Sequence, residues 1–369
     1  MTITKENYPS TFKGFGVDKA ENWNKPKLVE YKAKDMTPTE LCVKIECCGL
    51  CGSDVHTLKG HWAPLQRDDL VVGHEVVGRV VSVGSQVSEF EIGERVGIGA
   101  ACNSCHNCVR CKNDNEQYCR KLIHTYNASD WKSDNYVTQG GYANYTIADE
   151  SFTFHIPENL ESVHAAPLMC GGLTVFSPLV RGVGFDAKGK NVGIIGIGGL
   201  GHMAIQFAAA IGAEVTAFSR TSSKKEQCLK MGAKYFVATN EDKEWYENYG
   251  DKFDMLLNCA SSFTDIDYSS FTKVLKVGAV FTTVGAPPVS EMLSFSPFQL
   301  ILNNLNICGS NIGSKKEAIK MLEIAAEKGI KPWIEEVPIS AKACGESLER
   351  CDKGDVRYRF VFTDYENAF

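Results

Sequence analysis

The run that most constrains the fold of this chain is NVGIIGIGGLGHMAIQFAAAIGAEVTAFS, residues 191–219. The apolar segment VGII leads into a glycine-rich turn, a helix-compatible run follows, and EVTAFS reads as a second strand. This order predicts a parallel α/β unit that presents a helix amino terminus to a pyrophosphate group. The alternative is a plain tight turn. We therefore expect a dinucleotide site, whose turn residues are Gly196, Gly198, Gly199, Leu200 and Gly201.

The residues that follow the second strand predict which dinucleotide binds. They read SRTSSK, residues 219–224, and include no acid. An Asp or Glu at this place binds the ribose 2′-hydroxyl of NAD(H), whereas hydroxyl and cationic groups bind the 2′-phosphate of NADP(H). Ser219, Arg220 and Lys224 therefore predict NADP(H). The alternative is a solvated surface turn.

A cluster of four cysteines has the spacing C-x2-C-x2-C-x7-C and consists of Cys105, Cys108, Cys111 and Cys119. Four thiolates surround Zn²⁺ as a tetrahedron and leave no position for water, so the spacing predicts a structural zinc site. An iron–sulfur cluster also uses four cysteines, but the bacterial pattern has a proline after the last one, where this chain has Arg120. Unligated thiols are the remaining alternative, and nearby Cys102 is expected to be a bystander.

A second candidate metal site combines residues far apart in the sequence, Cys51, His74 and Cys170. Each residue alone is ordinary core material. Together they provide the two thiolates and one imidazole of a catalytic zinc site that keeps its fourth position open. Such a metal is a Lewis acid that lowers the pKa of an alcohol. Glu75 adjoins His74, and it either orients the site, takes the open position, or is simply paired behind the ligands.

Composition and charge exclude several other functions. The net charge of −6 offers no basic surface for a phosphate backbone, so nucleic acid is not expected as a partner. The first residues have no secretory pattern, and no run reaches the roughly 20 apolar residues of a membrane span. The odd number of cysteines, 15 in 369 residues, suits reduced thiols better than disulfides. We expect a cytoplasmic protein without a membrane segment.

The pattern of predicted secondary structure changes along the chain. Up to about residue 160 it consists of short β-type runs, such as residues 40–50 and 70–84. From about Ala166 strands alternate with helical runs, which predicts a parallel sheet. A helix is expected at 314–329 and a final strand at 355–362. The length of the chain, together with a β-rich part and a part in which strands alternate with helices, predicts an α/β protein of two domains.

Seven ordered motifs resemble the zinc-dependent medium-chain alcohol dehydrogenases, most closely the NADP-dependent cinnamyl alcohol dehydrogenase branch. They cover nearly the whole chain and are CGLCGSDVH (48–56), VVGHE (71–75), CKNDNEQYC (111–119), QGGYANY (139–145), APLMCGGLTV (166–175), ASSFTDID (260–267) and DVRYRF (355–360). The resemblance implies a GroES-like, β-rich catalytic domain formed by residues 1–165 and 310–369. It also implies that a Rossmann domain, a doubly wound parallel sheet of residues 166–309, is inserted between them, and that the protein is a homodimer assembled through the Rossmann sheets.

The resemblance also implies roles for individual residues. Cys51, His74 and Cys170 would hold the catalytic zinc with Glu75 beside them, and the four clustered cysteines would hold a structural zinc. Ser53 and His56 would pass the proton between substrate and solvent, and Asp54 would lie behind the zinc ligands. The remaining residues carried over are expected to contact the cofactor, and they are Thr174 near the nicotinamide, Arg357 near the pyrophosphate, and the loop Ser310, Asn311 and Ile312.

The resulting hypothesis is a reversible, NADPH-linked reduction of small-molecule aldehydes to primary alcohols. The expected substrates are aromatic aldehydes of the cinnamaldehyde type and medium-chain aliphatic aldehydes. Two zinc ions per chain are expected. One alternative is an NAD-linked zinc polyol or secondary-alcohol dehydrogenase, against which the turn at Ser219 argues. Another is a non-enzymatic protein that binds zinc and a nucleotide, against which the complete set of ligands and relay residues argues. Trp62 is either a wall for aromatic substrates or a core or rim aromatic.

Overall fold

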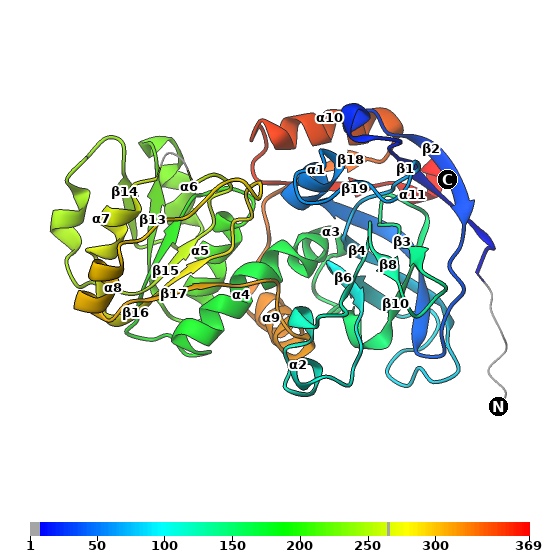
Figure 1. Ribbon diagram of the computed structural model, residues 1–369, viewed down its shortest axis with the longest axis horizontal. Helices are drawn as coiled ribbons and strands as arrows, with labels where there is room; N and C mark the ends of the chain where they lie inside the picture. Colours follow the sequence, from blue (N-terminus) through cyan, green and yellow to red (C-terminus); the bar gives the residue numbers. More distant parts are fainter. Residues whose placement is uncertain (1–7, 264–265) are drawn as a thin grey trace. The chain divides into compact units, whose positions relative to one another are not determined.

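The computed structural model describes residues 8–263 and 266–369, so Thr264 and Asp265 of the ASSFTDID motif lie outside the described residues. The chain divides into two units (Figure 1). The first comprises the chain up to Cys170 together with Ser314–Phe369, and the second comprises Gly171–Gly313. Boundaries after residues 165 and 309, as the sequence predicts, would place Cys170 in the second unit, whereas in the structure Cys170 belongs to the same unit as the other candidate zinc ligands.

The first unit is built on a seven-stranded sheet that uses both ends of the chain. Its order is β11-β5-β4-β3-β19-β18, and β10 also pairs with β3. The strands of this sheet are β3 (Glu40–Leu50), β4 (Glu75–Val83), β5 (Arg95–Ile98), β10 (Tyr145–Asp149), β11 (Thr153–His155), β18 (Ile334–Pro338) and β19 (Arg359–Thr363). Strand β19 runs antiparallel to β3 and places Phe360 opposite Leu50. The C-terminal segment is therefore part of the same core as the N-terminal half.

The core of this unit follows from nearly continuous apolar strands. In β3 only Lys44 is exposed, because both faces of this central strand are covered. Leu41, Val43 and Ile45 from β3 join Val76 from β4 and Phe360 from β19 in one buried cluster. Burial of such side chains from water is the main force that holds the sheet together.

Shorter elements surround the sheet. Three small antiparallel pairs are β1 (Thr11–Gly16) with β2 (Lys27–Lys32), β6 (Ala101–Asn103) with β7 (Ile123–His124), and β8 (Ser129–Asp130) with β9 (Tyr136–Val137). The helices are α1 (Gly52–Leu58), α2 (Val109–Lys112), α3 (Ser162–Ala165), α9 (Lys315–Lys328), α10 (Ala341–Asp352) and α11 (Tyr365–Ala368), with 3₁₀ turns η1 (Ala20–Asn22), η2 (Glu116–Tyr118), η3 (Glu150–Phe152) and η4 (Ala166–Met169). These turns and helices connect the strands, and α1 carries the candidate relay residues Ser53 and His56.

The helix predicted at 314–329 shows how local sequence sets its ends. Ser314 and Glu317 form a reciprocal capping box at the amino terminus of α9. Gly329 ends the helix with a φ of 65°, a conformation that glycine adopts without steric cost. The helix therefore spans Lys315–Lys328, as the sequence predicts.

The second unit is a six-stranded parallel sheet in the order β14-β13-β12-β15-β16-β17. Its strands are β12 (Asn191–Ile195), β13 (Glu214–Ser219), β14 (Tyr235–Ala238), β15 (Phe253–Asn258), β16 (Leu275–Thr283) and β17 (Asn306–Gly309). Its helices are α4 (Gly171–Val183), α5 (Gly201–Ala210), α6 (Lys225–Lys230), α7 (Tyr268–Thr272) and α8 (Pro297–Asn303), with 3₁₀ turns η5 (Ser222–Lys224) and η6 (Trp245–Tyr249). The order reverses at β12, which lies between β13 and β15. Ligands of such sheets bind at the carboxyl ends of the strands beside this reversal.

Two predicted strands begin later than the sequence suggests. The run from residue 70 becomes a strand only at Glu75, because Gly73 has a φ of 104° and breaks the extended backbone. The final strand begins at Arg359 rather than at residue 355. The predicted α/β fold, with a β-rich part formed from both chain ends and a doubly wound parallel sheet inserted between them, is confirmed.

Within residues 8–263 and 266–369, no single helix is long and apolar enough to cross a membrane. Only the consecutive helical segments Ser162–Met169 and Gly171–Val183 pass such a test, and only when they are taken together as a bent pair.

Candidate metal centres and cofactor site

The turn between β3 and α1 fixes the position of Cys51. This residue caps α1, and its backbone N–H donates to Oδ2 of Asp54 at 2.8 Å. The fully buried Asp54 carboxylate also accepts from the hydroxyl of Tyr142 at 2.9 Å and from the backbone N–H of Gly73 at 3.2 Å. Burial raises the pKa of Asp54, although the charge of His74 opposes this shift. Asp54 thus joins the turn of Cys51 to the loop that carries His74, which agrees with its expected place behind the ligands.

The candidate catalytic ligands come together in the first unit. One potential ligand atom from each of Cys51, His74, Glu75 and Cys170 lies within 4.8 Å of the others, and all four residues are buried. Nε2 of His74 has no hydrogen-bond partner in the described part of the chain, while its Nδ1 lies 3.8 Å from Oδ1 of Asp54. The imidazole is stacked on Tyr126, with ring centroids 5.2 Å apart. Burial of a polar nitrogen without a partner costs free energy. Zinc binds one imidazole nitrogen together with two thiolate sulfurs, so it would provide that partner here.

The pKa values of these candidate ligands depend on one another. A hydrogen bond from the Cys170 thiol lowers the pKa of Cys51, and the charge of Arg359 acts in the same direction. The same contact raises the pKa of Cys170. Burial lowers the pKa of His74, but Asp54 and Cys51 outweigh this effect and raise the value to about 9. A divalent cation would relieve this concentration of negative charge, so the residues present fit zinc.

Glu75 has a buried partner that the sequence analysis missed. The guanidinium of Arg359, the first residue of β19, donates to Oε1 of Glu75, and both side chains are almost fully buried. Burial raises the pKa of Glu75 to about 7, against the opposing effect of Arg359. A Cβ atom at Gly49 would lie 2.1 Å from Oε2 of Glu75, so only glycine fits there. The ion pair with Arg359 thus neutralises the charge of Glu75 beside Cys51, His74 and Cys170.

The expected relay residues share the short helix α1. Ser53 and His56 are three residues apart, which places them on one face of the helix. The Ser53 hydroxyl lies 3.5 Å from the sulfur of Cys51. Trp62 stacks on the His56 ring, with centroids 5.0 Å apart and an interplanar angle of 14°. Nδ1 of His56 also lies 2.9 Å from Nδ1 of His61, a contact that the sequence does not predict.

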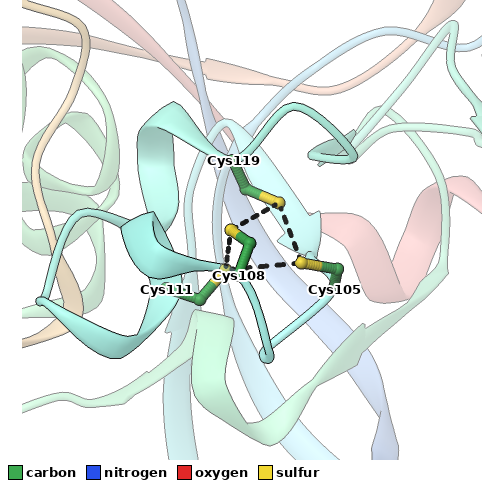
Figure 2. Close-up of side chains that lie close together, drawn as sticks. All are labelled: Cys105, Cys108, Cys111 and Cys119. Carbon is green, nitrogen blue, oxygen red and sulfur yellow. Dashed lines mark hydrogen bonds between the residues drawn. The ribbon is translucent and has the colours of Figure 1, made fainter.

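The four clustered cysteines form a second candidate metal centre (Figure 2). The sulfur of Cys119 lies 3.4 Å from that of Cys105 and 3.9 Å from that of Cys108, and Cys111 lies 3.5 Å from Cys108 and 3.9 Å from Cys105. A tetrahedron with Zn–S bonds of about 2.3 Å has sulfurs about 3.8 Å apart. The observed spacing therefore fits zinc with four sulfur ligands and no open position.

Neighbouring groups hold these sulfurs in place. The backbone N–H of Lys121 donates to Cys119 at 3.3 Å, and the Ser104 hydroxyl lies 3.4 Å from Cys111. Backbone N–H groups, that of Asn107 first, lower the pKa of Cys105 to about 6, which favours its thiolate. Cys102 lies outside the group and contacts the backbone oxygen of His124 at 3.5 Å, as expected for a bystander.

The glycine-rich turn after β12 has the geometry of a phosphate cradle. Gly196 has a φ of 83°, and a Cβ there would lie 2.9 Å from the backbone nitrogen of Ala260. A Cβ at Gly201 would lie 2.1 Å from the carbonyl oxygen of Gly196. In contrast, nothing lies within 4 Å of a Cβ at Gly198, so a ligand can approach the backbone there. Gly199 and Leu200 complete the turn into α5.

The turn after β13 presents both hydroxyl groups and cations. Ser219 ends the strand, and Arg220 is exposed. Lys224 donates from Nζ to the carbonyl oxygen of Ile197 at 2.5 Å, which brings its charge to the glycine-rich turn. An acid that the sequence analysis missed also lies here, since Oε1 of Glu241 accepts from the backbone N–H of Ser222 at 2.8 Å.

The other expected cofactor residues are divided between the two units. Thr174 lies in the first turn of α4, and Ser310, Asn311 and Ile312 follow β17. The Ser310 hydroxyl is buried with no hydrogen-bond partner among the residues described, and Ile312 has a φ of 50°. Arg357 is exposed in the first unit, where Nη1 donates to the backbone oxygen of Val356 at 3.2 Å. Its expected contact with pyrophosphate stays a prediction.

Known proteins resemble the chain over its whole length. Residues 37–158 match the family "Alcohol dehydrogenase GroES-like domain", and residues 199–327 match "Zinc-binding dehydrogenase". The NADP-dependent alcohol dehydrogenase 6 of Saccharomyces cerevisiae is 46% identical over 98% of this chain and 99% of its own length. A probable cinnamyl alcohol dehydrogenase 6 of Arabidopsis thaliana is 38% identical over 87% of this chain and 86% of its own.

Solved structures agree with these sequence matches. A cinnamyl alcohol dehydrogenase from Sorghum bicolor superposes with a TM-score of 0.89 at 31% identity, covering 97% of this chain and 99% of that one. A cinnamyl alcohol dehydrogenase from Helicobacter pylori, complexed with NADP(H), gives 0.87 at 30% identity with the same coverage of 97% and 99%. The predicted GroES-like and Rossmann folds are thereby confirmed. The chain therefore belongs to the zinc-binding alcohol dehydrogenases, in the branch that contains the cinnamyl alcohol dehydrogenases.

Proposed function

We propose that this alcohol dehydrogenase catalyses the zinc-dependent, NADPH-linked reversible reduction of aldehydes to primary alcohols, with cinnamaldehyde-type aromatic and medium-chain aliphatic aldehydes as substrates. The observation that carries the proposal is the ligand set. Cys51, His74 and Cys170 offer three buried donors to one metal, while Arg359 engages the neighbouring carboxylate of Glu75. Three protein ligands leave a coordination position for a substrate oxygen, which is the mark of a catalytic zinc site.

The chain's own residues have separate tasks in this reaction. Held by Cys51, His74 and Cys170, zinc would supply Lewis acidity to the substrate oxygen, and NADPH would supply the hydride. Asp54 fixes the backbone of Cys51 relative to the loop that carries His74, because its carboxylate accepts hydrogen bonds from both. The Ser53 hydroxyl, beside Cys51, donates a proton to the product oxygen in reduction, and Nε2 of His56 replaces that proton. In alcohol oxidation the same protons move in the opposite direction.

Two observations support NADP(H) as the cofactor. The turn after β13 offers Ser219, Arg220 and Lys224 to a 2′-phosphate, although Glu241 reduces the local positive charge. The Saccharomyces relative carries NADP dependence in its name, and the Helicobacter structure contains NADP(H). The test is the ratio of kcat/KM for NADPH to that for NADH with one aldehyde. A ratio near one would contradict the assignment.

We also propose two zinc ions per chain and a cytoplasmic homodimer. The two ligand sets support the zinc content, and metal analysis of the purified protein tests it. Strand β17 lies at the edge of its sheet, and Val289, Met292, Phe298 and Ile301 are 68–79% exposed in the segments that precede it in the chain. An unpaired edge with apolar neighbours favours pairing with a second copy. Light scattering during size-exclusion chromatography measures whether the mass is twice 40.6 kDa.

A second candidate function is the NAD-linked oxidation of a polyol or secondary alcohol. It is retained because a mannitol dehydrogenase of Petroselinum crispum is 38% identical over 86% of this chain and 91% of its own length. A four-way rate comparison decides between the two candidates. Cinnamaldehyde and hexanal with NADPH should react at least about tenfold faster than mannitol with either oxidised cofactor, and the opposite order would favour the polyol.

A further inference from the structure

Two histidines meet through the same ring nitrogen in the first unit. Nδ1 of His56 lies 2.9 Å from Nδ1 of His61. A neutral imidazole has a proton on only one of its nitrogens, so one ring donates in this contact and the other accepts. Nδ1 of His56 is therefore occupied, and Nε2 is the atom left to exchange a proton with Ser53.

The contact is built into the backbone rather than formed by chance between long side chains. Helix α1 ends at Leu58, and Gly60, with a φ of 69°, reverses the chain. The backbone N–H of His61 then donates to the carbonyl oxygen of His56 at 3.0 Å. Trp62 stacks on the His56 ring and limits its rotation. Both rings are only partly buried, so water reaches the pair.

We propose that His61 is a positioning residue of the proton relay, and that it forms with His56 a pair that takes up and gives back one proton. The proposal rests on the proposed dehydrogenase function. In alcohol oxidation a proton arrives at Nε2 of His56 and forms a new N–H bond there. The resulting imidazolium donates its Nδ1–H to the unprotonated Nδ1 of His61, which spreads the charge over both rings. Loss of one proton to water returns the pair to neutrality, and no electrons are transferred.

The surroundings favour one charge on the pair but not two. A second proton would place two imidazolium groups in contact, and their repulsion opposes it. Burial lowers the pKa of His56, and the charge of His61 lowers it further. The other charged groups that act on His56 are Cys51, Asp352 and Lys59, and the last two are paired at 2.5 Å. Among these titratable groups His61 is the one whose ring nitrogen contacts that of His56, so its charge opposes a second proton on the pair most directly.

A titration of the pair tests the proposal without substrate. The full-length protein is labelled with ¹⁵N-histidine, and the ring nitrogens are followed by NMR between pH 5 and 9. In the wild type we expect the signals assigned to His56 and His61 to move together with the first proton, and the second proton to bind only at lower pH. In His61→Asn the His56 ring should titrate in one step. Independent one-step titrations of both rings in the wild type would overturn the proposal.

Kinetics of two variants test the role in turnover. His61→Phe keeps a ring but offers no acceptor, and it should lower kcat at pH 7 by about 3- to 30-fold while KM for NADPH changes less than about twofold. His61→Asn keeps an acceptor oxygen near the place of Nδ1 and should recover most of the lost rate. Equal losses in both variants, or no loss in either, would overturn the relay role. His155→Phe, at an exposed histidine elsewhere, is the control.

The two proposals fail in different ways. A wild-type protein that reduces no aldehyde contradicts the proposed function, whereas the NMR titration still reports on the pair. An active wild type whose His61→Phe variant keeps the full rate and the same pH profile contradicts the histidine pair alone.

Discussion

Arg359 and Glu75 form a buried ion pair across 284 positions of the chain, and this pair adjoins the candidate zinc ligand His74. The carboxylate belongs to the start of β4 and the guanidinium to the start of β19. The two residues thus link the VVGHE motif (71–75) to the C-terminal part of the sheet.

Removing one member of this pair should destabilise the protein strongly. Arg359→Leu leaves Glu75 buried without its cation, so we expect a loss of about 3–5 kcal/mol in the free energy of unfolding. Chemical denaturation monitored by fluorescence measures it. The double variant Arg359→Leu/Glu75→Gln should lose less than the single variant. A double variant that is less stable than Arg359→Leu would contradict this explanation.

Loss of a catalytic ligand should abolish turnover while the fold remains. In Cys51→Ser we expect kcat to fall by at least about 1,000-fold, because a hydroxyl replaces a thiolate ligand of the Lewis-acid metal. Zinc content should drop by about one ion per chain, as measured by atomic emission, and circular dichroism should stay unchanged. Cys308→Ser, at an exposed cysteine, is the matched control and should keep both zinc and activity. Wild-type turnover in a folded Cys51→Ser protein would rule out zinc chemistry.

The four-cysteine centre should contribute to stability rather than to chemistry. Cys111→Ala removes one of four sulfurs, and we expect loss of one zinc ion and a fall of Tm by more than about 5 °C, since metal binding there is coupled to folding of the loop. Cys102→Ser is the control, because Cys102 lies outside the group. An equal loss of zinc in both variants would mean that Cys102 is a ligand.

The cofactor preference should reverse when an acid is introduced at Ser219, the last residue of β13. Ser219→Asp places a carboxylate where the 2′-phosphate is expected, and repulsion should lower kcat/KM for NADPH by about 10- to 100-fold. Efficiency with NADH should rise or stay constant. Ser219→Asn, of similar size and without charge, separates electrostatics from shape. If both variants lose the same efficiency with NADPH, repulsion is not the cause.

The stability of the β-rich unit should depend on pH through Asp149. Burial raises the pKa of this carboxyl, but hydrogen bonds from His106, Ser151 and Thr39 outweigh burial and hold it well below its usual range. The folded state therefore binds the proton more weakly than the unfolded state, where the pKa is about 3.9. The resulting stability is complete above that value and is lost as the pH falls below it.

Asp149→Asn measures this contribution. We expect a loss of about 1–3 kcal/mol at pH 7, since hydrogen bonds to a charged group are replaced by weaker ones. The difference between the wild type and Asp149→Asn should shrink as the pH falls below about 4, as followed by urea unfolding at several pH values. A constant difference across this range would show that the carboxylate charge is not responsible.

Local sequence patterns predict those parts of the site that are formed by one segment. The spacing of Cys105, Cys108, Cys111 and Cys119 predicts their grouping, because a single loop carries all four. The glycine-rich turn is predicted for the same reason. Glycines at 196 and 201 occupy places where a side chain would meet the backbone.

Contacts between distant segments are less accessible to such reasoning. Nothing in the spacing of DVRYRF shows that Arg359, rather than Arg357, faces inward, because this depends on the pairing of β19 with β3. The sequence does not predict the contact of His61, because a histidine after a short helix has no pattern of its own and only the reversal at Gly60 turns it back to His56. The sequence does not predict that Glu241 contacts the turn after β13, because Glu241 follows the neighbouring strand β14.

The pairing of β19 with β3 also affects synthesis of the protein. A ribosome makes the candidate zinc ligands Cys51, His74 and Cys170 long before it makes residue 359. Until that residue has left the exit tunnel, the ion pair between Glu75 and Arg359 cannot form and β3 lacks one of its neighbours. The candidate catalytic centre can therefore mature only after Arg359 has emerged, and a chain cut short before that residue would carry all three candidate zinc ligands without the environment that they require.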